Sequence, residues 1–139
     1  MRYMGIDYGT RRIGIALSDV SGSMAFPESV MENHGLVAVA QEILAMCALK
    51  NVGTIVLGES KNFRGEANAV MGDITELKRV LEKEIPVRYE NETFTSAEAS
   101  RGAPSEGLLD ASAAAIILNT YLVRMRTGSP GQAREPALD

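Results

Sequence analysis

The sequence predicts an α/β fold in which a mixed five-stranded sheet carries helices on both of its faces. Two observations lead to this class. The opening part of the chain reads as strands that reverse at short turns, and the rest of the folded part alternates helical and strand-like segments. Strands joined by tight turns pair antiparallel, whereas strands that alternate with helices pair in parallel. Since the chain has 139 residues, one domain accounts for its length.

The opening segment is a predicted antiparallel series of three strands. Residues 2–7 alternate loosely and end in a Tyr-Gly-Thr turn, and isoleucine and leucine then recur at every second position over residues 13–17. A two-residue period is typical of strands. A third strand is expected at residues 24–30, where Pro27 favours an edge position because proline cannot donate a ladder hydrogen bond.

Residues 36–50 predict an amphipathic helix. Its apolar residues Leu36, Ala40, Ile43 and Cys47 are spaced by four, three and four positions, which places them on one helix face. Cys47 is the only cysteine in the chain. We therefore expect it in the core, and we expect neither an intramolecular disulfide nor a cysteine-based metal centre.

The remaining segments continue the alternation of strand and helix. Apolar β-branched runs predict strands, and apolar residues at three- and four-residue spacing predict helices. Along the chain we expect a strand at 54–57, a helix at 66–84, a strand at 86–90, a short helix that starts at Thr95 and a last helix at 108–126. These segments define a single domain over residues 1–126, followed by a flexible C-terminal tail over residues 127–139.

Charge and composition limit the class of function. The chain carries 14 lysine and arginine residues against 18 aspartate and glutamate residues, a formal net charge of −4. This balance argues against nucleic-acid binding through bulk positive charge and leaves room for a local basic groove. No apolar run approaches the roughly 18–20 residues that a bilayer span requires. The N-terminus also lacks the apolar core of a signal peptide, so the protein is expected in the cytoplasm.

Three carboxylates lie where packing alone does not explain them. Asp7 ends the first predicted strand, Glu92 follows a later strand, and Asp110 falls on the apolar stripe of the last helix. A carboxylate on an inward-facing stripe is costly unless it is paired or binds a metal. Three carboxylates that converge would suit Mg²⁺ or Mn²⁺. Two such ions can support hydrolysis of a phosphodiester bond.

Each carboxylate also has a simpler interpretation. Asp110 can be an N-cap, and Asp7 followed by Gly9 can be a plain turn. An exposed Glu92 would be an ordinary solvated side chain. His34, the only histidine, lies in a loop before a helix and is expected as a surface turn residue.

Basic residues flank the expected carboxyl edge of the sheet. Arg11 and Arg12 follow the first strand, and Lys61 and Arg64 lie in the loop after the strand at 54–57. They can be solvated surface charges or they can hold phosphate groups.

Four stretches resemble the YqgF (RuvX) family of small bacterial nucleases. The opening stretch DYGTRRIGIALSD at residues 7–19 is similar to the first family motif, and LDASAAAIIL at residues 109–118 is similar to its last helix. Between them, Val-Leu-Gly at 56–58 with Asn62 and Gly65 resembles the glycine loop, and Glu92 with residues 95–99 resembles the Asp-Glu-Arg segment. The matches span residues 3–122.

The resemblance implies an RNase H-like fold and a set of site residues. It implies that the metal-binding catalytic carboxylates are Asp7, Glu92 and Asp110. It implies that the nucleic-acid-binding residues are Arg11, Arg12, Lys61, Asn62 and Arg64. Two departures stand out, because Thr93 replaces the usual arginine and Ser60 a common proline. Glu90 is the alternative ligand if the register of Glu92 is off by two.

The leading hypothesis is an endonuclease that depends on Mg²⁺ or Mn²⁺ and cuts structured nucleic acid. The resemblance implies pre-16S rRNA, processed at its 5′ end, or a four-way DNA (Holliday) junction as the partner. A junction has two-fold symmetry, so a resolvase is expected to act as a homodimer. The Asp-x-Gly-Thr turn also resembles the ATP-binding turn of the actin and sugar-kinase superfamily, of which this chain would supply one lobe. A non-catalytic nucleic-acid-binding module is the remaining alternative.

Overall fold

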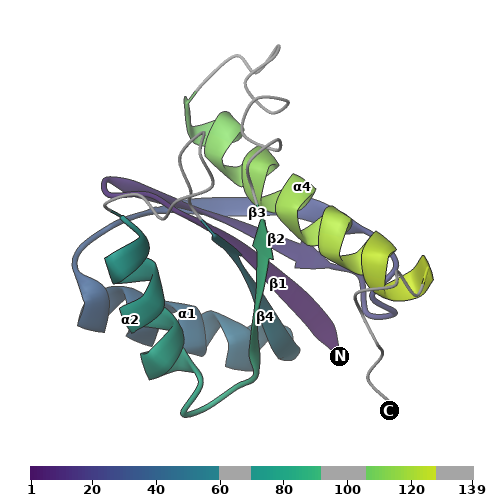
Figure 1. Ribbon diagram of the computed structural model, residues 1–139, viewed down its shortest axis with the longest axis horizontal. Coiled ribbons are helices and arrows are strands. Elements are labelled where there is room, and N and C mark those ends of the chain that lie inside the picture. The colour runs from purple at the N-terminus through teal and green to yellow at the C-terminus, as the bar shows by residue number, and fades with distance from the viewer. Residues whose placement is uncertain (60–69, 92–105, 128–139) are drawn as a thin grey trace.

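The computed structural model describes residues 1–59, 70–91 and 106–127, and the side chains of residues 106–110 and 127 are outside this description. Five strands and three helices are defined in these ranges (Figure 1). They are β1 (Arg2–Tyr8), β2 (Arg12–Ser18), β3 (Ala25–Glu32), α1 (Leu36–Lys50), β4 (Val52–Glu59), α2 (Met71–Leu81), β5 (Val87–Asn91) and α4 (Glu106–Thr127).

The strands form one mixed sheet in the order β3-β2-β1-β4-β5. β1 pairs antiparallel with β2, and β2 with β3, whereas β1, β4 and β5 run parallel. The predicted mixed sheet is confirmed, and β3 with Pro27 lies at an edge. Because β1 is central, its carboxyl end meets those of β4 and β5 at one edge of the sheet.

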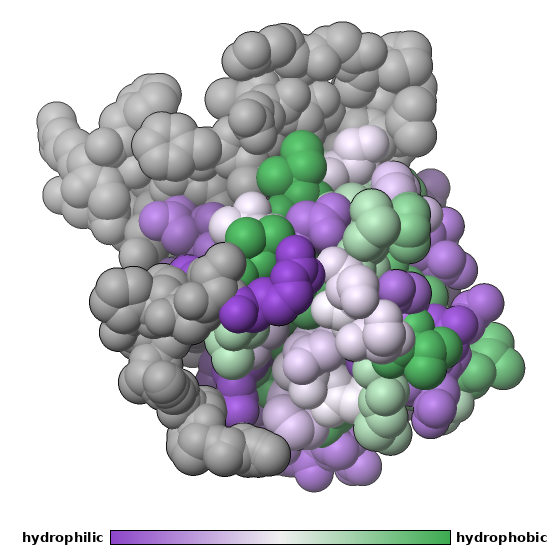
Figure 2. All heavy atoms as spheres, turned by 90° about the vertical axis from the view of Figure 1, so that its right-hand side faces the viewer, coloured by the Kyte–Doolittle hydropathy of each residue, from purple (hydrophilic) through white to green (hydrophobic). Residues whose placement is uncertain are grey.

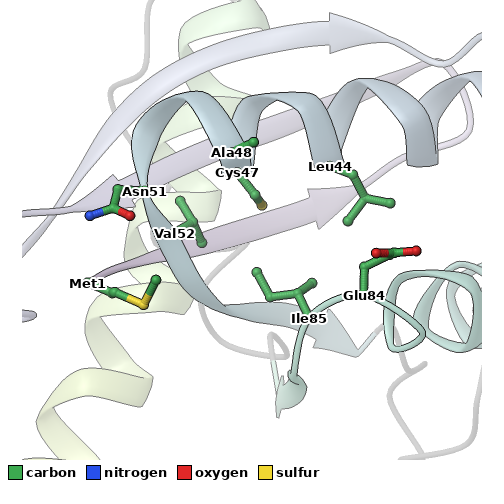
Figure 3. Close-up of a pocket in the computed structure, with 8 residues that line it drawn as sticks. All are labelled: Met1, Leu44, Cys47, Ala48, Asn51, Val52, Glu84 and Ile85. Atoms are coloured by element: carbon green, nitrogen blue, oxygen red, sulfur yellow. The ribbon is translucent and has the colours of Figure 1, made fainter.

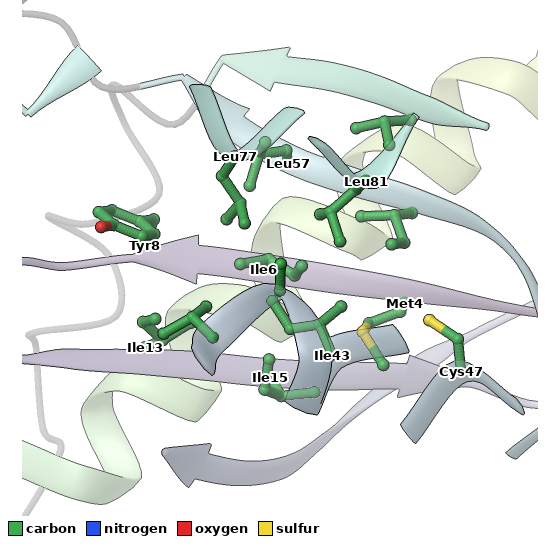
Figure 4. Packing of buried hydrophobic residues seen from close by; sticks show 14 of the residues in the cluster. Met4, Ile6, Tyr8, Ile13, Ile15, Ile43, Cys47, Leu57, Leu77 and Leu81 are labelled. Carbon is green, nitrogen blue, oxygen red and sulfur yellow. The ribbon is translucent and has the colours of Figure 1, made fainter. Parts of the chain in front are cut away.

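The larger core lies between the sheet and the helices α1 and α2 (Figures 1 and 4). Met4, Ile6 and Tyr8 alternate along β1 and point to this side, where they meet Ile43 of α1 and Leu77 of α2. Burial of the apolar stripes of α1 and α2 stabilises the fold by roughly 25 cal/mol per Å² of apolar surface. Cys47 is buried in this core as predicted, and burial raises the pKa of its thiol to about 11.

Among the described elements, α4 is the helix that covers the opposite face of the sheet (Figure 1). The smaller core on this side contains Ala16, Val56, Ala114 and Leu118. A Cβ atom added to Gly5 would lie 2.7 Å from Leu118 Cβ and 2.8 Å from the Ala114 carbonyl oxygen. Small residues therefore let the helix backbone approach β1 closely. Helices on both faces are confirmed.

The helix boundaries follow local chemistry. α1 has the predicted bounds and ends at Lys50. The next residue, Asn51, has a left-handed backbone and caps the helix, and its N–H donates to the Cys47 carbonyl oxygen. α2 ends at Leu81, three residues before the predicted end. Beyond Leu81 the amides of Lys83 and Glu84 donate to carbonyls three residues earlier, which tightens the chain into a turn ahead of Pro86.

A cavity of about 360 Å³ lies between the end of α1, the start of β4 and the segment before β5, and is lined by residues such as Met1, Cys47 and Ile85 (Figure 3). On the face shown in Figure 2, hydrophobic residues lie between hydrophilic ones. None of the helices described here has the length and apolar character needed to cross a membrane.

Candidate active site

Three residues share one row at the carboxyl edge of the sheet. Ile6 is aligned with Leu57 across β1 and β4, and Leu57 with Tyr89 across β4 and β5. The next residues along these strands are Asp7, Gly58 and Glu90. With strands about 4.8 Å apart, the Cα atoms of Asp7 and Glu90 are about 10 Å apart. Gly58 places no side chain between them.

Asp7 faces the same side of the sheet as α4. Gly5, two residues earlier in β1, contacts Ala114 and Leu118 of α4, and strand residues two apart share a face. The carboxylate of Asp7 is half-buried at the strand end, and its register partner in β2 is Gly14. The structure thus places Asp7 near the carboxyl end of β1, on the face of the sheet where α4 packs.

Glu90 is buried because it forms an ion pair. Its carboxylate accepts a hydrogen bond from the guanidinium of Arg124 in α4, and its side chain is only 3% exposed. Burial raises the pKa of Glu90, and the nearby Arg124 partly offsets this shift. The pairing explains how a glutamate is accommodated in a buried position here, and in this structure Glu90, the alternative ligand, is held by Arg124.

We expect Arg124→Met to destabilise the protein more at neutral than at acidic pH. Since the folded-state pKa of Glu90 lies above its unfolded value, protonation of Glu90 favours folding, and this contribution is lost as pH rises through the folded pKa. Removal of Arg124 should lower the free energy of unfolding by about 2 kcal/mol near pH 7, which is less than for a fully buried ion pair because Arg124 is partly exposed. The loss should be smaller near pH 4, where Glu90 is more often protonated and needs no cation. Urea titrations at both pH values would measure the difference.

Arg79→Met is the matched control, because Arg79 pairs with Glu76 on an exposed helix face. Its loss should change the free energy of unfolding little at either pH, because an exposed ion pair contributes little. The double variant Glu90→Gln/Arg124→Met should regain part of the lost stability, since no ionised carboxylate is left buried. An equal loss for Arg124→Met at both pH values would contradict the role assigned to this pair.

Arg11 and Arg12 lie where the turn after β1 leads into β2. Arg11 is exposed and Arg12 begins β2 opposite Glu32. Together with Thr10 they line a polar cavity of about 340 Å³. The turn is tight, because a Cβ atom on Gly9 would lie 2.5 Å from the Arg12 carbonyl oxygen. This tight turn therefore keeps the backbone of the two predicted phosphate-binding residues next to the strand end that carries Asp7.

The other predicted site residues are less completely described. Glu92, Lys61, Asn62 and Arg64 lie outside the described residues, as does the short helix expected from Thr95. The backbone of Asp110 belongs to α4, and its side chain is not described. Among the described residues, no group of three or more histidine, cysteine, aspartate or glutamate side chains could hold a metal ion. His34 is exposed, as expected of a surface turn residue.

Sequence reasoning missed two polar residues near this edge. Arg124 lies in the last helix with no nearby sequence signal for its pairing with Glu90. Asn33, which follows β3, makes side-chain hydrogen bonds with Tyr8 at the end of β1, with Gly9 in the next turn and with Gly35 before α1. Its only sequence signal is the Asn-His-Gly stretch before α1, which is typical of a turn.

Solved structures with similar folds define the class. Thermus thermophilus RuvC superposes with a TM-score of 0.62 at 18% identity, over 93% of this chain and 98% of that one. The fowlpox virus resolvase, solved with Holliday junction DNA, gives a TM-score of 0.58 at 11% identity, over 88% of this chain and 97% of that one. At these identities the likeness concerns the fold, which is the RNase H-like fold of the RuvC resolvases.

Comparison of the sequences identifies the family. Residues 1–124 match the family model described as "RuvX: Holliday junction resolvase", and the chain belongs to this family. A relative from Maridesulfovibrio salexigens, named "Putative pre-16S rRNA nuclease", is 33% identical over 134 residues, 89% of this chain and 99% of its own. A relative of the same name from Bacteroides thetaiotaomicron is 35% identical over 138 residues, 90% of this chain and 98% of its own. The protein is a hydrolytic nuclease.

Proposed function

We propose that this nuclease processes the 5′ end of pre-16S rRNA in the cytoplasm, with a divalent metal held by Asp7, Glu92 and Asp110. The observation that carries the proposal is the position of Asp7 at the carboxyl end of the central strand, on the face covered by α4. In sheets with parallel strands, ligands bind at this edge. The RNA substrate is supported by the names of relatives that match nearly the whole chain.

The direction of α4 supports Asp110 as a second ligand. α4 runs antiparallel to β1, because Tyr121 lies beside Tyr3, with ring centroids 6.1 Å apart, whereas Ala114 and Leu118 contact Gly5. From Ala114 back to residue 110 the helix advances about 6 Å. From Gly5 to Asp7 the strand advances about 7 Å in the same direction. The helix backbone at residue 110 is therefore carried toward the Asp7 end of β1.

The donor chemistry fits a hard divalent cation. Carboxylate oxygens are preferred ligands of Mg²⁺ and Mn²⁺, and the half-buried Asp7 carboxylate provides them at the strand end. When bound, such ions supply an activated water and stabilise the leaving oxygen. Asp7, Glu92 and Asp110 would hold and orient them. Arg11 and Arg12, exposed or half-buried beside a polar cavity, would bind the backbone phosphates next to the scissile bond.

Cleavage of four-way DNA junctions is the second candidate function. The family description names Holliday junction resolvases. A junction presents two symmetry-related cleavage sites, so this function would require a homodimer. The junction-cleaving form would elute from a sizing column at twice the monomer mass, whereas RNA processing places no such demand on the oligomeric state.

A cleavage assay on both substrates tests the proposal. We expect purified protein to cut a labelled pre-16S rRNA 5′ leader with Mg²⁺ or Mn²⁺ and to leave it intact with EDTA. Arg11→Ala and Arg12→Ala should each weaken binding and lower the slope of log affinity against log salt by about 1. Arg79→Ala, on an exposed face of α2, serves as the arginine control.

The outcomes separate the candidate functions. Cleavage of the junction alone would replace the RNA assignment. No cleavage of either substrate by folded protein would overturn the proposal and favour a non-catalytic binding module. A rise in melting temperature with ATP, and none with Mg²⁺ or Mn²⁺, would favour the nucleotide-binding alternative.

A further inference from the structure

We infer that Asn33 is a positioning residue of the active site, which fixes the turn between β1 and β2 against the segment that enters α1. This inference rests on the proposed roles of Asp7, Arg11 and Arg12. Asn33 lies outside the four stretches that resemble the family, and the basis of the inference is a set of hydrogen bonds that join segments 22 to 25 residues apart.

Asn33 uses both polar ends of its side chain. Its Nδ2 donates to the Tyr8 hydroxyl at 3.0 Å and to the Gly9 carbonyl oxygen at 2.9 Å. Its Oδ1 accepts the Gly35 amide at 3.0 Å. Its backbone N–H donates to the Arg11 carbonyl oxygen at 2.9 Å. One side chain thus joins the end of β1, the turn and the residue that precedes α1.

These bonds act on a turn that has little freedom of its own. The turn is Gly9, Thr10 and Arg11, and the contact between Gly9 and the Arg12 carbonyl oxygen leaves no room for a side chain at position 9. Such a turn moves as a unit with the strand ends. Asn33 therefore sets where the whole unit lies, and with it the backbone that carries Arg11 and Arg12.

The hydrogen bond from Asn33 to the Tyr8 hydroxyl also constrains the backbone at Asp7. The Tyr8 ring is buried in the core with α1 and α2, and its hydroxyl points away from the other labelled core residues (Figure 4). Asp7 precedes Tyr8 and points to the opposite face, since successive strand residues alternate. A Tyr8 held at both its ring and its hydroxyl fixes the backbone from which the Asp7 carboxylate projects.

Asn33 also lines two cavities beside the turn. One cavity, of about 340 Å³, is lined by Arg11 and Arg12, and the other, of about 370 Å³, by Asp73 and Glu76 of α2. Thr10 and Asn33 line both. Glu32 also lines the first cavity, so the position of the turn sets the distance from Arg11 to the carboxylates of both cavities, and with it the attraction of Arg11 for phosphate. The position of Asn33 thus affects phosphate binding as well as the Asp7 backbone.

Asn33→Ala tests the inference, because it removes three side-chain bonds and keeps the backbone bond to Arg11. We expect faster amide hydrogen exchange over residues 8–12 and a kcat/KM lower by about tenfold. The salt slope of binding to the labelled RNA leader in EDTA should fall by about 1, as for Arg11→Ala. In the double variant Asn33→Ala/Arg11→Ala the slope should fall no further.

Two control variants separate positioning from general stability. His34→Ala, at an exposed neighbouring position, should change none of these quantities. Tyr8→Phe removes one of the three bonds and should show a smaller effect in the same direction. A purely structural Asn33 would lower the melting temperature without altering the salt slope or its coupling to Arg11.

The outcomes also distinguish this inference from the proposed function. Unchanged hydrogen exchange over residues 8–12 in Asn33→Ala would overturn the inference, whatever the activity. Faster exchange with unchanged kcat/KM and salt slope would overturn the positioning role and leave the proposed function intact. Failure of the wild-type protein to bind or cut either substrate would contradict the proposed function, and the positioning role with it, even if exchange were faster.

Discussion

Asp7→Asn is expected to abolish cleavage while the protein stays folded. The substitution keeps the shape of the side chain and removes the charge that a divalent cation requires. We expect kcat to fall at least about a thousandfold. Stability without metal should be unchanged or slightly higher, because fewer carboxylates would repel one another at this edge. Initial rates and urea titrations on the same preparation measure both effects.

Asp19→Asn is the matched control for the change of charge. Asp19 follows β2, away from the carboxyl ends of the parallel strands, and its Oδ1 accepts the Ser23 amide at 2.8 Å. An asparagine retains an oxygen acceptor for this bond. We expect full activity from this variant. The mechanism would be wrong if Asp7→Asn cut the substrate at the wild-type rate. Binding of Mn²⁺ to the protein, measured by calorimetry, should be lost in Asp7→Asn together with activity.

Gly5→Ala should strongly destabilise the fold. The added Cβ would lie under 3 Å from both Leu118 Cβ and the Ala114 carbonyl oxygen, and neither atom is at the end of a flexible side chain. α4 and β1 would have to separate. We expect a loss of about 3 kcal/mol in the free energy of unfolding, at the upper end for overpacking a core.

The same change should also lower activity, since residue 110 lies on α4 and Asp7 on β1. A shift between these two elements separates two of the proposed metal ligands, and we expect kcat to fall at least about tenfold. Gly72→Ala is the control, because a Cβ there meets nothing within 4 Å and should stabilise α2 by about 0.5 kcal/mol. A wild-type melting temperature for Gly5→Ala would contradict the close packing of α4 on β1.

Local patterns were sufficient to predict most of the secondary structure. The two-residue period of β2 and the apolar stripe of α1 each reflect contacts with one face of a neighbouring layer, so they are visible in the sequence. The end of α2 was predicted three residues too late, because residues 82–84 retain helix-forming composition. Their tight turn ahead of Pro86 depends on how the chain re-enters the sheet at β5.

The candidate site was only partly accessible from the sequence. Asp7 could be singled out because a carboxylate ends an apolar strand. Glu90 has no such signal, because its burial depends on an ion pair with Arg124, which lies 34 residues away in the sequence. Asn33 read as a turn residue, and its contacts with Tyr8 and Gly9 depend on where β3 ends beside the first turn.

The sequence by itself determined the order of the elements, the mixed character of the sheet and the family to which the chain belongs. These depend on short-range periodicity and on residue types within single motifs. Only the tertiary structure decided which side chains meet, such as Asn33 with the turn, Glu90 with Arg124 and Gly5 with α4. Contacts of this kind join residues far apart in the chain, and their geometry depends on how the sheet and helices pack, which no local pattern records.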